Sequence, residues 1–148
     1  MDGDGCTITV APKGFGSENM SRIQMLKPAD GVEGFRKFVL ETSSWPVPTP
    51  ARPSCWASAW AAALTRWPIW PKRHCSARWM FPNPDPYYAQ LERELLTAIN
   101  ALGIGPQGFG GQTTCLGLAI EQMPTHVAGL PAAVNVSCHV TRRASAEL

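Results

Sequence analysis

Residues Met123–Arg143 read MPTHVAGLPAAVNVSCHVTRR, a pattern that predicts a turn, a strand and then a loop carrying a cysteine. The small residues Ala128–Pro131 favour a turn shortly after His126. The run Ala132–Val136 is short and mainly apolar, which is typical of a strand. Cys138 follows at its far end. A cysteine in a loop after a strand can serve as a metal ligand, although a lone cysteine is more often a small buried apolar residue.

The N-terminal region predicts a strand followed by a glycine-bearing loop. Cys6–Val10 (CTITV) alternates polar and apolar residues and is rich in β-branched side chains, which indicates a strand. Lys13–Asn19 (KGFGSEN) follows as a loop. Gly14 and Gly16 permit positive φ angles and allow backbone N–H groups to approach an anion closely. From the residues alone, a simple turn is the more economical interpretation of this loop.

Two amphipathic helices are predicted further along the chain. Asp30 is expected to cap the first, in a capping box with Glu33, and this helix is expected to stop at Ser43. Asp85 is expected to cap the second, which Gly103 ends, and its acidic residues are expected to face solvent. The expected buried positions are Val32, Phe35, Phe38 and Val39 in the first helix and Tyr88, Leu91, Leu95, Ala98, Ile99 and Leu102 in the second.

The order strand, helix, helix, strand predicts one α+β (mixed α/β) domain within residues 1–148. No stretch is long and apolar enough to span a membrane, and the acidic N-terminus does not resemble a signal peptide. Five cysteines without a secretory signal indicate free or metal-bound thiols in a reducing compartment. The expected location is therefore cytoplasmic.

Residues 43–81 differ in composition from the rest of the chain. They hold all six tryptophans, six of the 14 prolines and five Lys or Arg residues, but no Asp, Glu or Gly. The remainder has eight Lys or Arg against 11 Asp or Glu, a net charge of about −3. Aromatic and cationic residues together could bind nucleic acid or a membrane surface. We expect neither, because another interpretation accounts for the segment better.

Three blocks of the sequence resemble one known family. They are Lys13–Gly31 (KGFGSENMSRIQMLKPADG), Asn83–Thr114 (NPDPYYAQLERELLTAINALGIGPQGFGGQTT) and Pro124–Arg143 (PTHVAGLPAAVNVSCHVTRR). Each is similar to part of the α-type domain of the iron–sulfur hydro-lyases, the family of class I fumarases and tartrate dehydratases. GSENMS is a specific string within it. The fold is therefore expected to be a fragment of that α-type domain.

The genetic code relates residues 43–81 to the same family. Every Trp codon is UGG, so reading one nucleotide earlier gives a codon ending in UG and then one beginning with G. In that frame Trp56–Ala62 is compatible with LGVGVGG, where the family carries GVGIGG. Pro48–Pro53 is compatible with ANPCPP, where the family carries its cysteine motif NPCPP. We interpret 1–42 and 82–148 as family-like, and 43–81 as an irregular insert produced by a frameshift.

The resemblance implies a cofactor and a mechanism. Family members hold a 4Fe–4S cluster through three cysteines, and its open iron acts as a Lewis acid on a 2-hydroxy acid while a general base removes a proton. Only Cys138 matches a family ligand. The resemblance implies that the first family cysteine belongs to a block before the matched residues, and that the second would lie in the segment interpreted as frameshifted. Cys6, Cys55, Cys75 and Cys115 match no ligand position.

The resemblance also implies substrate contacts. His126 matches a histidine near the substrate and is the predicted catalytic residue, whereas a surface histidine is the plainer alternative. Gly14, Gly16, Ser17 and Asn19 are the predicted substrate-binding residues, receiving a carboxylate of a small dicarboxylate. Cys138 is the predicted metal ligand. A β-type hydro-lyase domain or subunit is the expected partner, with no nucleic acid or membrane.

The expected function is the reversible hydration of fumarate to malate, a reaction of the tricarboxylic acid cycle, impaired in this chain by the missing ligands. Tartrate dehydratase α subunit and a non-catalytic remnant are the alternatives.

The frameshift hypothesis makes a prediction about the coding DNA. Translated one nucleotide earlier, codons 43–81 should read without a stop and should encode a cysteine across Pro50–Ala51 and a GVG-like string across Trp56–Ala62. Sequencing of codons 42–82 tests this. A stop codon in that frame, or other residues at those two places, would contradict it.

Overall fold

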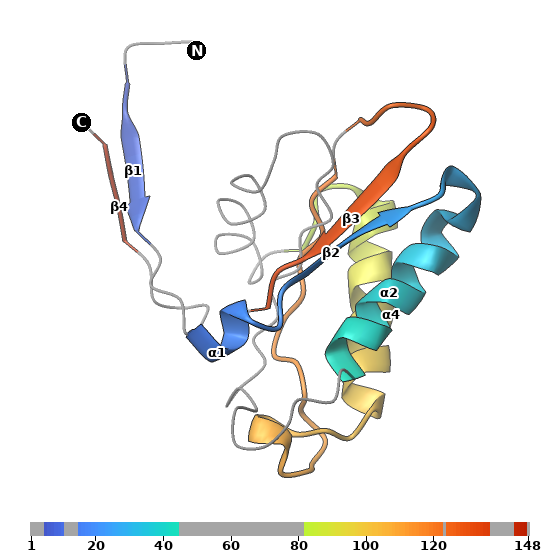
Figure 1. The fold of residues 1–148 in the computed structure, drawn as a ribbon. Coiled ribbons are helices and arrows are strands. Elements are labelled where there is room, and N and C mark those ends of the chain that lie inside the picture. Colours follow the sequence, from blue (N-terminus) through green and yellow to red (C-terminus); the bar gives the residue numbers. More distant parts are fainter. Residues whose placement is uncertain (1–4, 11–14, 45–81, 123, 137–143, 148) are drawn as a thin grey trace.

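A computed structural model describes residues 5–10, 15–44, 82–122, 124–136 and 144–147 of the 148-residue chain. Figure 1 shows helices together with strands paired as antiparallel ladders, which confirms the α+β (mixed α/β) class. The elements in chain order are β1 (Thr7–Val10), α1 (Phe15–Glu18), β2 (Arg22–Leu26), η1 (Pro28–Asp30), α2 (Gly31–Ser44), α4 (Pro86–Ala101), η2 (Pro106–Gly108), β3 (Leu130–Val134) and β4 (Ala144–Glu147).

The central ladder joins β2 and β3 in an antiparallel pair. Arg22 lies opposite Val134 and Leu26 lies opposite Leu130. The strand expected at Ala132–Val136 therefore begins and ends two residues earlier than predicted, because its paired residues are those that face β2. β2 was not predicted from the sequence, although Arg22–Met25 alternates polar and apolar residues, and its apolar Ile23 and Met25 are exposed.

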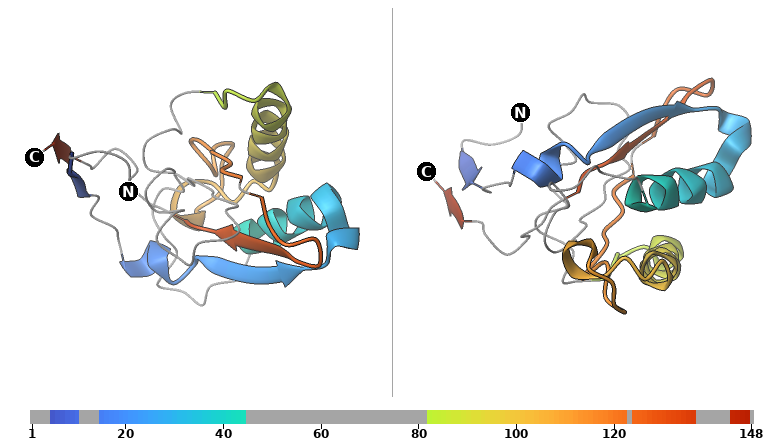
Figure 2. Two further views of the ribbon diagram at one scale, coloured as in Figure 1. Left: turned by 90° about the horizontal axis from the view of Figure 1, so that it is seen from above. Right: turned by 60° about the horizontal axis from the view of Figure 1, so that its bottom comes forward.

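A second ladder joins the two ends of the described chain. β1 covers all but the first residue of the strand predicted at Cys6–Val10, and it pairs antiparallel with β4 from Thr7 opposite Glu147 to Val10 opposite Ala144. β4 was not predicted from the sequence. In Figures 1 and 2 this ladder stands apart from α2 and α4. The four residues of β4 are exposed.

Helix α2 begins at Gly31, directly after the predicted cap Asp30, and ends later than the sequence indicated. The carboxylate of Asp30 accepts a hydrogen bond from the Lys27 N–H at 2.8 Å, so Asp30 stabilises η1 and the helix starts at Gly31. The helix continues through Ser43 and Ser44, which corrects the irregular structure expected from residue 43. The Ser43 hydroxyl is buried and donates to the Val39 carbonyl at 3.0 Å. The rest of the anomalous segment, 45–81, lies outside the described residues.

Helix α4 follows the sequence prediction at both ends. The Asp85 carboxylate accepts a hydrogen bond from the Tyr87 N–H at 2.9 Å, which confirms the N-cap, and Pro86 is the first helical residue. Gly103, with φ of 63°, follows the helix and permits the chain to leave it. Leu102 is exposed, contrary to the predicted stripe, because it lies at the C-cap beyond the last packed turn.

The core lies between the β2–β3 ladder and the two long helices. α2 packs on one face of the ladder and α4 packs against α2 (Figure 2). Val32, predicted to be buried, is 38% exposed because it lies at the start of α2, at the edge of this core. The main buried side chains are Leu26, Phe38, Val39, Leu91, Leu95, Ile99, Cys115, Leu118, Ile120, Ala132, Val134 and Val136.

An ion pair joins the two helices on the solvent side of this core. The Arg36 guanidinium of α2 donates to the Glu94 carboxylate of α4 and also lies near Glu33 one turn earlier. The hydrogen bond from Arg36, and then one from Gln90, hold the pKa of Glu94 below its ordinary value. The ionised pair therefore helps to set how the two helices lie beside each other.

Glu92 corrects the prediction that the acidic residues of α4 face solvent. It is only 8% exposed. Its carboxylate accepts hydrogen bonds from the Ile120 N–H at 2.7 Å and from the Asn83 side-chain amide at 3.1 Å. The same Asn83 amide donates to the Ile120 carbonyl at 2.8 Å. Glu92 thus ties the segment after η2 to the segment before α4.

Substitution of Glu92 by Ala should lower the free energy of unfolding by about 3 kcal/mol, because it leaves the buried Ile120 N–H without an acceptor. Urea denaturation measures the effect. Arg93→Ala, one position along on the exposed side of α4, is the matched control and should change stability by less than about 0.5 kcal/mol. Equal effects of the two substitutions would contradict a structural role for Glu92.

Candidate functional site

The predicted substrate loop includes one helical turn. Gly14 lies outside the described residues, while Gly16 and Ser17 belong to α1. Gly16 is half-buried and does not use a positive φ angle, so the conformational freedom expected of it is not used here. Ser17 is buried at 1% exposure, whereas Asn19, just after the turn, is exposed. Asn19 is therefore the polar side chain of this set that solvent reaches most readily.

Hydrogen bonds attach this loop to the segment that follows β3. The Ser21 hydroxyl donates to the Asn135 side-chain oxygen at 3.1 Å and accepts from the Val136 N–H at 3.2 Å. These contacts join residues more than 100 positions apart in sequence. They bring the loop Gly16–Asn19 close to the residues that lead into Cys138, which itself lies outside the described residues. Ser21 was not among the predicted site residues, although it lies in the GSENMS string.

Two thiols are placed in the described residues. Cys6 is exposed next to β1, and Cys115 is buried, with its thiol donating to the Gly117 carbonyl at 3.1 Å. Within residues 5–10, 15–44, 82–122, 124–136 and 144–147, no three His, Cys, Asp or Glu side chains lie close enough together to hold a metal ion. The described residues therefore do not fit a 4Fe–4S cluster, which needs several thiolates converging on one point.

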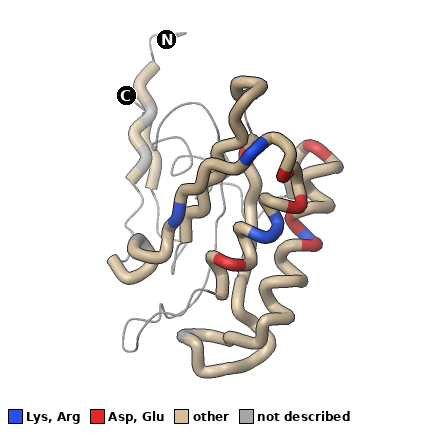
Figure 3. Tube along the Cα trace, turned by 45° about the vertical axis from the view of Figure 1, so that its right-hand side comes forward, with Lys and Arg blue, Asp and Glu red and all other residues tan. Residues whose placement is uncertain are grey.

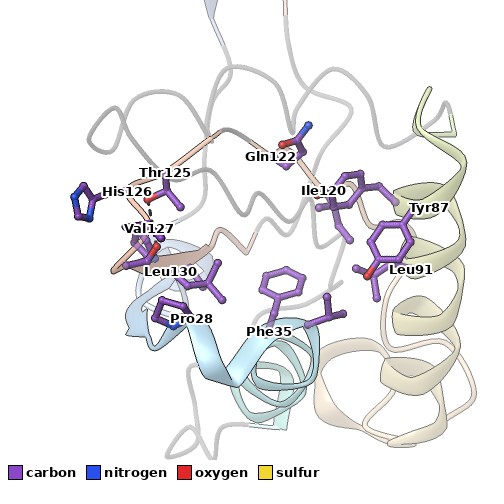
Figure 4. A pocket seen from close by; sticks show the side chains of 16 residues that line it. Pro28, Phe35, Tyr87, Leu91, Ile120, Gln122, Thr125, His126, Val127 and Leu130 are labelled. Carbon is purple, nitrogen blue, oxygen red and sulfur yellow. Dashed lines mark hydrogen bonds between the residues drawn. The ribbon is translucent and has the colours of Figure 1, made fainter.

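His126 occupies an exposed turn before β3. The Gly129 N–H donates to the His126 carbonyl at 3.0 Å, and the Ala128 N–H donates to His126 Nδ1 at 3.1 Å. The second bond leaves Nε2 to carry the proton of the neutral ring. Figure 4 shows the imidazole at the rim of a cavity, directed away from the apolar side chains. Its Nε2–H is thus available to an external acceptor.

The structure does not bring His126 together with the predicted substrate loop. His126 precedes Leu130 at one end of the β2–β3 ladder, and Asn19 precedes Arg22 at the other (Figure 1). The ends of the ladder are four residues apart along each strand, and at a rise of about 3.3 Å per residue this is about 13 Å. One small dicarboxylate held at Asn19 therefore cannot also contact His126 in this arrangement.

A cavity of about 420 Å³ lies between the N-terminal ends of α2 and α4 and the segment 120–132. Its lining is mostly apolar, with Tyr88, Gln122 and Thr125 among the polar groups (Figure 4). Burial raises the pKa of Tyr88 above its ordinary value, and the nearby Asp85 carboxylate and Tyr87 add to the effect. No Lys or Arg occurs among the described residues that line it. The cavity alone offers a dicarboxylate no cationic partner.

Comparison with known proteins identifies related chains. A candidate L(+)-tartrate dehydratase subunit alpha from Methanocaldococcus jannaschii is 39% identical over 137 residues, which are 93% of this chain and 48% of that protein. The L(+)-tartrate dehydratase subunit alpha of Escherichia coli strain UTI89 is 31% identical over 142 residues, 96% of this chain and 47% of that protein. The corresponding protein of strain K12 is 30% identical over the same length. The chain thus spans about half the length of these relatives.

The family described as fumarate hydratase (fumerase) aligns with residues 1–147. This chain belongs to the fumarate hydratase family. The helices placed in the structure include none with the length and apolar character needed to cross a membrane.

Loss of the Ser21 hydroxyl should loosen the connection between the loop and the segment after β3. In Ser21→Ala the Val136 N–H and the Asn135 side chain lose their shared partner, so the free energy of unfolding should fall by about 1–2 kcal/mol. Hydrogen exchange should become faster at the Val136 amide. Ser44→Ala, which removes an exposed hydroxyl, is the control. Unchanged exchange at Val136 in Ser21→Ala would contradict the connection.

Proposed function

We propose that this chain forms part of the α-type unit of a hydro-lyase that adds water to, or removes it from, a four-carbon dicarboxylate. Membership of the fumarate hydratase family over residues 1–147 supports this class of reaction. Fumarate with malate is the first substrate pair. The names of the listed relatives make L(+)-tartrate an equally supported alternative.

One structural observation carries the proposal: the hydrogen bonds of Ser21 with Asn135 and Val136. Two family-like blocks meet there, one with the predicted substrate loop and the other leading to the predicted metal ligand. Cys138 follows Val136 by two residues in the sequence. We assign Gly14, Gly16, Ser17, Asn19 and Cys138 to one side of the active site on this basis.

A substrate carboxylate at this place would meet the exposed Asn19 amide, which is a neutral donor. His126 would act elsewhere, because about 13 Å of ladder separates the two. Its Nε2–H could donate to a substrate group presented on a neighbouring chain. A β-type hydro-lyase domain or subunit is the partner that would supply such a group, and the relatives' description as alpha subunits supports the existence of one.

The implied cofactor places a limit on what this chain can do alone. A 4Fe–4S cluster would supply a Lewis acid for the leaving hydroxyl. The described residues do not provide its set of ligands, and Cys138 would be a single ligand. Full activity would then require thiolates from other polypeptide. A non-catalytic remnant is the second candidate function, and the absence of a ligand group in the described residues is the observation that favours it.

Anaerobic reconstitution with iron and sulfide tests the proposal. When a polypeptide that supplies further thiolates is present, we expect the wild-type chain to retain iron, and we expect that iron to be lost in Cys138→Ala and retained in Cys6→Ser, which removes an exposed thiol next to β1. Iron content and the visible absorbance of the cluster are the measurements. Addition of a β-type subunit should then give hydration of fumarate or dehydration of L(+)-tartrate, and the ratio of the two rates identifies the substrate.

Two results would contradict the proposal. Equal iron content in wild type and Cys138→Ala would remove Cys138 from the site. A reconstituted complex with full iron and no turnover of either substrate would favour the non-catalytic remnant.

A further inference from the structure

The β2–β3 ladder carries apolar side chains on both faces. Leu26, Ala132 and Val134 point toward α2 and are buried. Ile23 and Met25 alternate with Leu26 along β2 and point to the opposite face, where they are 61% and 70% exposed. Strands with apolar residues on both faces are typical of a sheet that is covered on both sides. Only one side of this ladder is covered by described elements.

The outer face is defined by two cross-strand pairs, Ile23 with Ala133 and Met25 with Pro131; Ile23 and Met25 are exposed, and Ala133 and Pro131 are half-buried. β3 contains no charged residue, and the only one in β2 is Arg22 (Figure 3). The Arg22 guanidinium lies 5.5 Å from the ring centre of Phe38, on the side of α2. The outer face therefore offers a partner an apolar surface without charges from either strand.

The ladder is also small for a sheet. It has two strands, whereas sheets usually have about four to six, and an isolated two-stranded ladder is marginally stable. Its two outer edges pair with no other described strand. A covering layer of further chain would bury the outer face and could extend the ladder at an edge.

We propose that the outer face is the packing surface for the half of the family's α-type chain that this chain does not match. The matched residues are 47–48% of the relatives' length, so the unmatched half is about as long as this chain and long enough to form a layer. The contact surface of that half is apolar and uncharged, to match the outer face.

The size of the outer face argues against a second copy of this chain as the occupant. A stable interface between free proteins buries about 800 Å² on each partner, from about 20–30 residues. Four residues, two of them small, fall well short of that. The unmatched half can also pair with the two edges of the ladder, so the outer face has to supply only part of its contact with this chain.

Co-expression with the unmatched half of the Methanocaldococcus jannaschii alpha subunit tests the proposal. The two polypeptides should co-purify, and Ile23→Glu with Met25→Glu should weaken the complex at least about tenfold, because two carboxylates would be buried without partners. The control pair Phe109→Glu and Leu116→Glu changes two other exposed apolar residues and should leave the affinity unchanged. Circular dichroism checks that each variant is folded.

A milder variant separates loss of binding from loss of the strand. Ile23→Thr with Met25→Thr keeps strand-forming residues and removes most of the apolar surface, so it should also weaken the complex. The proposal is overturned if no complex forms, if the outer-face and control variants bind equally well, or if the outer-face variants change only self-association in ultracentrifugation. Loss of binding to a β-type subunit alone would overturn it as well, because the occupant would then be that subunit.

Discussion

The antiparallel pairing of β2 with β3 is the contact on which the described fold depends. It joins Arg22–Leu26 to Leu130–Val134, segments separated by more than 100 residues. The pairing gives α2 an apolar face to pack on, and α4 then packs on α2. It also fixes how far apart the turn containing His126 and the loop containing Asn19 lie, since each precedes an opposite end of the ladder.

Polar groups inside this arrangement act as connectors. Glu92 holds the segment at Ile120 to the start of α4, and Ser21 holds the glycine-bearing loop to Val136. Both hydrogen-bonded connections join segments that are far apart in the sequence. A buried polar group without a partner costs free energy. These hydrogen bonds therefore favour the one arrangement of segments in which each buried group has its partner. Apolar burial packs the helices on the ladder, and these hydrogen bonds determine how the connecting segments lie against them.

The chain has the surfaces expected of part of a larger domain. One face of the central ladder is apolar and open, and the β1–β4 ladder stands apart from the helices with Ile8 and Val10 exposed. The thiols in the described residues do not converge on a metal site. These features agree with a chain that spans about half the length of its relatives in the fumarate hydratase family.

Local chemistry allowed the sequence to predict several features. Asp85 and Pro86 determine where α4 begins, because capping needs only neighbouring residues, and three blocks of residues identify the family. Tertiary structure alone decided the rest. The pairing of β2 with β3, the burial of Glu92 and the separation of His126 from Asn19 depend on partners far along the chain. Strand pairing and buried hydrogen bonds are long-range interactions, so a site assembled by them becomes visible only in the folded protein.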